Sequence, residues 1–528
     1  MTAPASAGFG RPELDVLVVG AGPVGLFTAC ELLRRGLRVR LIDREPEPMR
    51  VPRALALWPR ALDILADLGI AEQLHQASIP ITGAEYHSGG DPLATFLVPE
   101  RLQPRHLPQY ETERLLAERL RQLGGKVERG VRLLGFDDLD GAGRIEAADR
   151  LTSILEHTGG GPVERVAASF VIGADGASST VRGLIGVGFH GSTYELAFAL
   201  VDARVCEQTP NTLPRNRLLY YQRPTGSLMI APLPDDVFRI LAVLPRRDRE
   251  IDVEFMQQVL DERGPGGVTI TEPTWQTVYR VHARQASEYQ RGRAFLVGDA
   301  AHVHSPAGGQ GMNNGIQDAF NLAWKIAAVL DNSSPATLLA DYTAERGEAT
   351  NRIIADTDRQ TRAWMANSRL RITLRDAAFR LMRRTGLVPR YVIPVMAGRR
   401  VTYTPTRATQ SPSGNPPCVR LSRVPGRLKV GMAFPRETAV GLGITGTPDE
   451  PPTWTIVAVT KSGGQAASPH PAVRTVVLSP RAARKATGCS RPGFYLIRPD
   501  GHIQAHGHAA DGAHLAAELE LVLPGADS

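Results

Sequence analysis

Cysteine is scarce in this chain of 528 residues, which has only four. They are Cys30, Cys206, Cys418 and Cys489, and no two stand close enough for a CxxC pair or a zinc knuckle. We therefore expect no metal site. Thiols this sparse are typical of a cytoplasmic protein in which they stay reduced.

Long apolar runs and blocks of one charge are also missing. No stretch of 18 apolar residues occurs, which predicts no transmembrane helix. The first 15 residues lack the apolar core of a signal peptide. The net charge is +7, but no run of five basic residues occurs, which argues against a nucleic-acid-binding tail. We expect a cytoplasmic monomer or homodimer whose partner is a small molecule, not a nucleic acid or a membrane.

The clearest pattern in the sequence is a strand, a glycine loop and a helix between Asp15 and Arg44. Four apolar residues at 16–19 suit a parallel strand buried on both faces. The loop is a G-x-G-x-x-G, formed by Gly20, Ala21, Gly22, Pro23, Val24 and Gly25. The apolar residues that follow recur at helical spacing, and a second strand at 39–42 ends at Asp43.

Each residue type in this pattern suits a dinucleotide. Gly20 and Gly22 allow the backbone to approach a pyrophosphate, and Gly25 lets the helix pack on the strand. The free N–H groups of the helix N-terminus then face the phosphates. Asp43 lies 23 residues after Gly20, close to the ~20 expected for an acid that binds a ribose hydroxyl. Two further matches, at 186–191 and 441–446, follow no apolar strand and are interpreted as turns.

Two more apolar strands end in an acid, at Asp175 and at Asp299. Ligands of open α/β sheets bind beyond the carboxyl ends of the strands, so three such ends predict one extended ligand. A glycine-rich segment at 306–314 then opens another apolar helix. Its N-terminus would stabilise a ring system that becomes anionic on reduction.

The order of these patterns suggests how the chain is divided. Residues 1–183 and 285–398 would form two parts of one nucleotide-binding domain. The alternating stretches at 184–284 predict an inserted antiparallel sheet. A linker is expected at 399–417 and a separate α/β domain at 418–528.

Four separated motifs together resemble the group A flavoprotein monooxygenases. They are GAGPVG with Asp43, the loop arginine Arg53, DGASSTVR, and GDAAHVHSPAGGQGMNNGIQDAFNLAWK. Within that family the chain is similar to the FAD-dependent aromatic polyketide hydroxylases, relatives of phenol hydroxylase. The resemblance implies an α/β protein with a Rossmann-like FAD domain, an inserted antiparallel substrate sheet and a thioredoxin-like C-terminal domain. A weak signature of the last is IRPDG at 497–501, and because Cys418 and Cys489 are 71 apart this domain should be redox-inert.

The same resemblance implies roles for residues in the adenosine half of FAD. Residues of the glycine loop, including Pro23 and Val24, would hold the pyrophosphate. Asp43 would bind the ribose, and Arg44 would lie by the adenine.

For the flavin half, Arg53 and Gln109 would contact the pyrophosphate and ribityl chain, and Asp299 the ribityl hydroxyls. Pro306 would place a backbone carbonyl near the reactive flavin carbon. The pyrimidine edge would be held by Gly311, Met312, Asn313 and Asn314. Asp175 belongs to a motif thought to serve both FAD and the nicotinamide cofactor.

The activity implied is oxygen transfer to an aromatic ring. In that family NADPH or NADH reduces FAD, O2 adds to give a flavin hydroperoxide, and the distal oxygen passes to an electron-rich ring. Without a second Rossmann unit, the nicotinamide would bind transiently in the same cleft. A Baeyer–Villiger or ring-opening oxygenase on the same scaffold is the alternative, and a non-catalytic flavin- or antibiotic-binding protein is a less favoured one.

The substrate is expected to be polycyclic and phenolic or quinonoid. Candidate pocket residues on the antiparallel sheet are Tyr220, Tyr221, Met229, Pro232 and Phe238. Aromatic and thioether side chains suit a broad flat ligand, although plain sheet packing explains any one of them equally well. A compact carboxylate would need a dedicated buried arginine. His302 and His304 resemble a metal-binding pair, but an H-x-H pair by itself is more often structural, and they are interpreted as structural.

Overall fold

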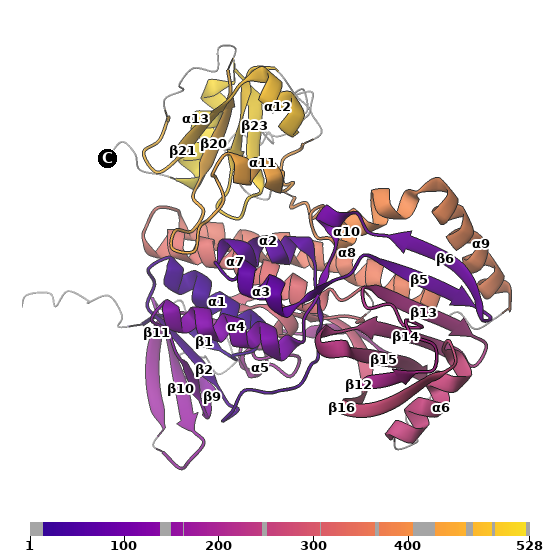
Figure 1. Ribbon diagram of the computed structural model, residues 1–528. Coiled ribbons are helices and arrows are strands. Elements are labelled where there is room, and N and C mark those ends of the chain that lie inside the picture. The colour runs from indigo at the N-terminus through magenta and orange to yellow at the C-terminus, as the bar shows by residue number, and fades with distance from the viewer. Residues whose placement is uncertain are drawn as a thin grey trace, which may run out of the picture.

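The computed structural model describes residues 14–137, 149–161, 163–244, 251–306, 308–364, 369–404, 428–460, 468–487, 491–509 and 511–523. Two large sheets lie side by side, and a third, smaller sheet belongs to the C-terminal unit (Figure 1). The residues of the predicted site come from segments of both large sheets.

The first sheet is parallel at its centre, as the apolar strands predict. Its order is β17-β18-β11-β1-β2-β8, and β11 also pairs with β10, which pairs with β9. Its strands are β1 (Leu14–Val19), β2 (Val39–Asp43), β8 (Val127–Arg129), β9 (Val131–Phe136), β10 (Leu151–His157), β11 (Glu164–Gly173), β17 (Gln290–Arg291) and β18 (Ala294–Leu296). The three strands predicted to share a ligand, β1, β11 and β18, are direct neighbours and run in parallel.

Helices cover this sheet and bury its apolar residues. α1 (Pro23–Arg34) packs against α4 (Gln109–Gln122) and α7 (Gly311–Leu330), and Phe27 of α1 lies 6.5 Å from Phe320 of α7 between ring centroids. The shorter elements nearby are β3 (Ala56–Leu57), α2 (Pro59–Asp67), α3 (Ala71–Ala77), β4 (Ile79–Pro80), η1 (Glu100–Leu102), β7 (Arg105–His106), α5 (Thr180–Leu184), η3 (Gly298–Ala300) and η4 (Ala336–Leu339).

The second sheet is mainly antiparallel, with the order β19-β16-β12-β15-β14-β13-β5-β6. Its strands are β5 (Gly83–Ser88), β6 (Asp91–Leu97), β12 (Phe189–Glu207), β13 (Arg217–Arg223), β14 (Gly226–Pro232), β15 (Val237–Leu244), β16 (Val268–Ala286) and β19 (His302–Val303). The segment 184–284, predicted to form this sheet, supplies β12 to β15 and most of β16, and the sheet also includes strands from outside it. β5 and β6 come from the first segment of the chain, and β5 pairs in parallel with β13. Such long-range pairing carries no local sequence signal.

Each face of the second sheet is covered by different helices. α6 (Val253–Arg263) packs on one face with a cluster that includes Leu228 and Ile240. α8 (Ala340–Trp364) and α9 (Arg369–Thr385) lie against the other, where Phe379 of α9 packs on β5 and β6. Beyond α9 follow η5 (Val388–Val392) and α10 (Ile393–Met396).

The C-terminal unit is a four-stranded mixed sheet of order β21-β20-β22-β23 with helices around it (Figure 1). Its elements are α11 (Arg436–Gly441), β20 (Thr455–Val459), β21 (Arg474–Leu478), α12 (Pro480–Thr487), β22 (Gly493–Ile497), β23 (Ile503–His508) and α13 (Gly512–Val522). It joins the rest of the molecule through an apolar contact in which Trp454 meets Trp324 of α7 edge-on at 5.6 Å. Most of the predicted linker, and both Cys418 and Cys489, lie outside the described residues.

In the portion of the chain that is described, no helix is both long enough and apolar enough to span a membrane.

Candidate functional site

The glycine loop lies between the end of β1 and the start of α1, and its three glycines do different work. Gly20 has φ +101°, and a Cβ there would lie 2.5 Å from the carbonyl oxygen of Ala174. A Cβ on Gly25 would overlap the carbonyl oxygen of Gly20. Within the described structure, a Cβ on Gly22 would meet no atom within 4 Å. The first and third glycines therefore serve packing, while open space lies over the second, at the N-terminus of α1, where a pyrophosphate fits.

Asp43 ends β2 beside this loop. Its Oδ2 accepts a hydrogen bond from the Ala21 N–H at 2.6 Å, and its Oδ1 accepts one from the Glu45 N–H at 2.9 Å. The neighbouring Arg44 is exposed and pairs with Glu45 at 3.2 Å. The carboxylate is thus held against the glycine loop, which is where an acid must lie to reach a ribose attached to that pyrophosphate.

Arg53 lies on an exposed loop that is held in place from two directions. The Gln109 Oε1 accepts from the Ala54 N–H at 3.1 Å. On the other side, Arg239 of β15 donates to the carbonyl oxygens of Arg53, at 2.6 Å, and Pro52. The loop is therefore fixed to α4, which covers the first sheet, and to β15 of the second sheet.

Arg239 itself is buried and neutralised. Its Nε and Nη2 each donate to Asp202 at 2.8 Å, so the carboxylate binds both arms of the guanidinium. The indole of Trp275 lies 5.5 Å from the guanidinium carbon. A buried ion pair of this geometry leaves little capacity for a further anion.

Three of the predicted flavin motifs meet at one point. Gly298, with φ +59°, follows the third strand, and a Cβ on it would lie 3.1 Å from Val24 of the glycine loop. A Cβ on Gly315 of α7 would lie 2.5 Å from the same valine. The turn that carries Asp299 is thereby packed between the glycine loop and α7.

The carboxylate of Asp299 is open to solvent, whereas the residues on either side of it are buried. The protein that surrounds it raises the pKa of Asp299, and the nearby His302 and Arg53 side chains partly offset the rise. Asp299 and Arg53 therefore lie close enough to interact electrostatically.

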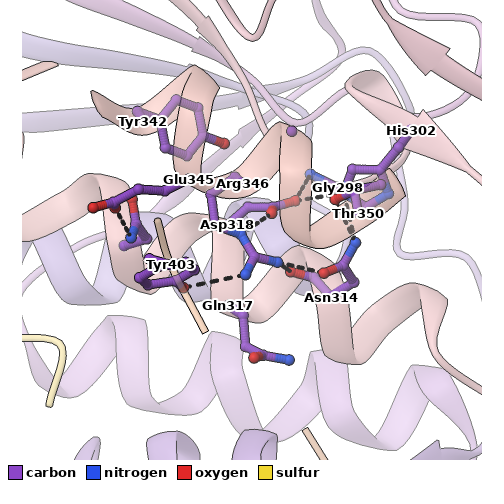
Figure 2. Close-up of polar contacts among 12 residues, drawn as sticks. Gly298, His302, Asn314, Gln317, Asp318, Tyr342, Glu345, Arg346, Thr350 and Tyr403 are labelled. Atoms are coloured by element: carbon purple, nitrogen blue, oxygen red, sulfur yellow. Dashed lines mark hydrogen bonds and ion pairs between the residues drawn. The ribbon is translucent and has the colours of Figure 1, made fainter. Parts of the chain in front are cut away.

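A buried polar network centred on Asp318 supports the turn at Gly298 and Asp299 (Figure 2). The Oδ2 of Asp318, in α7, accepts from the Gly298 N–H at 3.1 Å and from the His302 Nε2 at 2.6 Å. Its Oδ1 accepts from the Nε of Arg346, in α8, at 2.7 Å. Burial opposes ionisation, but Arg346 and His302 hold the pKa of Asp318 below its ordinary value. The structural interpretation of His302 agrees with this geometry, and no metal-binding group of three or more His, Cys, Asp or Glu occurs among the described residues.

Other residues predicted to bind FAD form hydrogen bonds within the protein. The carbonyl of Pro306 accepts from the Gly309 N–H at 2.9 Å, which closes a turn. The side chain of Asn313 donates to the carbonyls of Ala56, at 2.8 Å, and Gly309, at 2.7 Å, and accepts from the Trp58 N–H at 2.7 Å. It ties the start of α7 to β3, and the first backbone N–H groups of α7, like those of any helix, have no partner within the helix.

Asp175 caps a helix. Its carboxylate accepts from the Ser179 hydroxyl at 2.5 Å and from the N–H groups of Thr180, at 2.7 Å, and Val181, at 3.1 Å, at the start of α5. Burial raises the pKa of Asp175 against these bonds, which lower it. The sequence could not distinguish this cap from a ligand contact, because both use an acid at a strand end.

The five candidate pocket residues divide between the two faces of the second sheet. Tyr221 and Phe238 are buried in the cluster beneath α6, whereas Tyr220 and Met229 lie on the face toward α8 and α9. Successive side chains on a strand point to opposite faces, so Tyr220 and Tyr221 cannot line one pocket. For Tyr221 and Phe238 the geometry therefore favours the alternative of plain sheet packing.

Pro232 shares the α6 side of β14 by the same alternation. On the other face, the ring of Tyr220 stacks on that of Tyr86 at 4.7 Å, and Phe198 stacks on Tyr279 at 5.9 Å. This face, rich in flat rings, is the candidate substrate surface.

Comparison with known proteins identifies the family of this chain. A family model described as FAD binding domain matches residues 13–357. The chain belongs to this family of FAD-binding proteins. It is 32% identical to the 6-methylpretetramide 4-monooxygenase of Streptomyces rimosus over 97% of this chain and 94% of that protein. It is also 36% identical to the rifampicin monooxygenase of Streptomyces venezuelae, over 66% of this chain and 71% of that protein.

Among solved structures, the anhydrotetracycline hydroxylase OxyS of Streptomyces rimosus is similar, with a TM-score of 0.73 and 26% identity over 97% of this chain and 99% of that one. Together with the relatives, it identifies the protein as an FAD-dependent monooxygenase of the aromatic hydroxylase type.

Sequence reasoning missed the residues that support the site. The pair Asp202 and Arg239 and the pair Asp318 and Arg346 each join segments far apart in the chain. The available signal was a charged residue inside an otherwise apolar stretch, such as Asp318 within the apolar stripe of α7.

Proposed function

We propose that this monooxygenase hydroxylates a polycyclic phenolic or quinone substrate, with NADPH or NADH as reductant and O2 as co-substrate. When bound, FAD supplies the redox chemistry, taking reducing equivalents from the nicotinamide and activating dioxygen. The observation that carries the flavin assignment is the open space over Gly22 at the N-terminus of α1. Backbone atoms already fill the corresponding space at Gly20 and Gly25, so among these three glycines only Gly22 leaves room for a pyrophosphate.

The residues along this ligand follow the order of the predicted site. Asp43 binds the adenosine ribose, and the N–H groups of the glycine loop hold the pyrophosphate. Arg53 and Asp299 hold the chain between pyrophosphate and ring. The positive end of the α7 dipole, at Gly311, would stabilise the negative charge of the reduced ring system.

The substrate class follows from the sheet face toward α8 and α9. It offers the rings of Tyr220 and Tyr279 and the thioether of Met229, which suit a broad apolar ring system. The buried Arg239 is bound by Asp202 and by loop carbonyls, so it does not serve a substrate carboxylate. The names of the polyketide-modifying relatives agree with a multi-ring substrate.

The test is NAD(P)H consumption by the purified protein with three ligand classes. Polycyclic phenols should accelerate it and yield a product heavier by one oxygen atom. Stimulation by single-ring carboxylates alone would contradict the pocket assignment. Stimulation by ketones alone, with a lactone or ring-opened product, would indicate Baeyer–Villiger chemistry instead.

We also propose that the C-terminal unit is thioredoxin-like. The proposal is supported by its strand pairing, in which β20 is parallel to β21 and antiparallel to β22, and β22 is antiparallel to β23. It has no redox function in this proposal. Replacing Cys418 and Cys489 with Ser should leave turnover unchanged, and a loss of turnover in a folded double variant would contradict this.

A further inference from the structure

The sequence singles out the segment Ile497 to Gly501, which the flavin site does not use. In the structure its two charged residues are buried against α7 and α8. The Arg498 Nη2 donates to the Glu345 Oε2 at 2.9 Å, and the Arg498 Nε donates to the Asp500 Oδ1 at 3.1 Å. A second nitrogen of Arg498 binds the other oxygen of Glu345. The C-terminal unit thus inserts an arginine into the charged interior of the FAD-binding part.

Glu345 is the centre of this charged interior. Besides Arg498, it accepts from the Lys325 Nζ at 2.7 Å and from the Asn321 Nδ2 at 2.8 Å. Burial opposes its ionisation, but Arg498 and Lys325 lower the pKa of Glu345 to about 2. Asn321 also donates to Asp500 at 3.2 Å, so α7, α8 and the C-terminal unit all meet here.

The next residue on α8, Arg346, leads to the flavin turn (Figure 2). It donates to Asp318, and the Asp318 carboxylate receives the Gly298 N–H directly before Asp299. Arg346 also donates to the Tyr403 hydroxyl at 3.2 Å. The ring of Tyr403 lies 4.1 Å from that of His502 in the C-terminal unit, which gives a second connection.

From this continuity we infer that Arg498 and Asp500 are positioning residues for the turn at Gly298 and Asp299, acting through Glu345 and Arg346 of α8 and then Asp318 of α7. Removing Arg498 leaves Glu345 and Asp500 buried without their shared cation, which is unfavourable and favours movement of α8. Because Arg346 is fixed to the same turn of α8, its contact with Asp318 loosens as well. The part concerning FAD rests on the proposed function.

A simpler interpretation is that Arg498 only attaches the C-terminal unit. The chain offers a matched control for it in Arg436, which crosses the same interface. Its guanidinium donates to the two oxygens of Asp67 at 2.8 and 2.5 Å, and Asp67 ends α2. Loss of either arginine removes a bidentate contact between the units, but only Arg498 leads to α8.

The experiment compares the full-length variants Arg498→Met and Arg436→Met. Hydrogen exchange at the Gly298 amide is measured without FAD, and the dissociation constant of FAD is measured separately by flavin fluorescence. In Arg498→Met we expect faster exchange at Gly298 and FAD binding weaker by roughly five- to tenfold. Arg436→Met should change neither, and Arg498→Lys should restore part of both effects.

These measurements distinguish positioning of the Gly298 turn by Arg498 from simple attachment of the C-terminal unit. Equal exchange at Gly298 in folded Arg498→Met and in the unmodified protein would overturn the inference, as would equal effects of the two arginine variants. Faster exchange with unchanged FAD binding would retain the coupling and overturn the proposed flavin role of the turn. If Arg498→Met does not fold, Asp500→Asn preserves the size of the side chain and is judged by the same measurements.

Discussion

Replacing Gly22 with alanine should separate folding from cofactor binding. Gly22 has φ −70° and ψ −178°, an extended conformation that alanine adopts readily. The new methyl group would meet no described protein atom within 4 Å. Alanine also restricts the unfolded chain, which at a compatible position stabilises a protein by ~0.4–1 kcal/mol. The FAD-free variant should therefore unfold at the same temperature as the unmodified protein, or slightly higher.

With FAD the same methyl group should be harmful. It would occupy the space at the N-terminus of α1 into which the pyrophosphate must come to reach the N–H groups. A hydrogen bond to a charged group contributes ~1.5–3 kcal/mol. Loss of one such bond weakens binding by roughly 10- to 150-fold, since each 1.4 kcal/mol is a factor of about ten.

The assay is the dissociation constant of FAD, measured beside the thermal midpoint of the FAD-free protein. Gly441→Ala is the control, because a Cβ on this α11 residue is also unobstructed and lies in the C-terminal unit. Gly25→Ala provides a contrast, because overlap with the carbonyl of Gly20 should lower the thermal midpoint itself. Unchanged FAD binding in Gly22→Ala would refute the pyrophosphate assignment.

Three further predictions concern other parts of the molecule. Asp43→Ala should weaken FAD binding by roughly ten- to a hundredfold through the lost ribose contact, and equal FAD retention would contradict this. Asp202→Asn should lower the free energy of unfolding by ~3–5 kcal/mol in a urea titration, because it leaves the guanidinium of Arg239 buried without the carboxylate that neutralises it, and Asp202→Leu with Arg239→Met should recover much of it. Burial raises the pKa of Glu518 to about 7, and Gln504 partly offsets the rise. The unfolded chain loses this proton near pH ~4.3, so the free energy of unfolding decreases as the pH rises from ~4.3 to about 7. Glu518→Gln should raise the thermal midpoint at pH 8 and leave it nearly unchanged at pH 4.5, and equal shifts at both pH values would count against this origin.

The flavin-binding strands could be predicted because their signals are local. Each is a short apolar run followed at once by a glycine or an acid, as at Gly20 and Asp299, and burial on both faces demands that composition. The ends of β1, β11 and β18 then had to meet at one edge. The glycine loop likewise depends on steric limits that act within a few residues.

The remainder depended on partners distant in the chain. Nothing near Tyr221 indicates that β5 pairs beside it or that α6 covers it, so the two sheet faces could not be assigned. The ion pair of Asp318 with Arg346 depends on a contact between two helices that no sequence period indicates. The cap made by Asp175 is local, but an acid at a strand end is equally typical of a ligand contact.

The interleaving of the two large sheets also governs how the chain can fold during synthesis. β1 and β5 leave the ribosome early, but the first sheet gains β18 only at residues 294–296, and β5 gains its neighbour β13 only at 217–223. At ~5–20 residues per second, the roughly 130 residues between β5 and β13 correspond to about 6–26 seconds, during which β5 has only its hairpin partner β6. The pairings of β1 with β11 and of β5 with β13 join segments more than 100 residues apart, which slows folding further. Yield in a heterologous host should therefore depend on chaperone supply and translation rate more than on the stability of the finished protein.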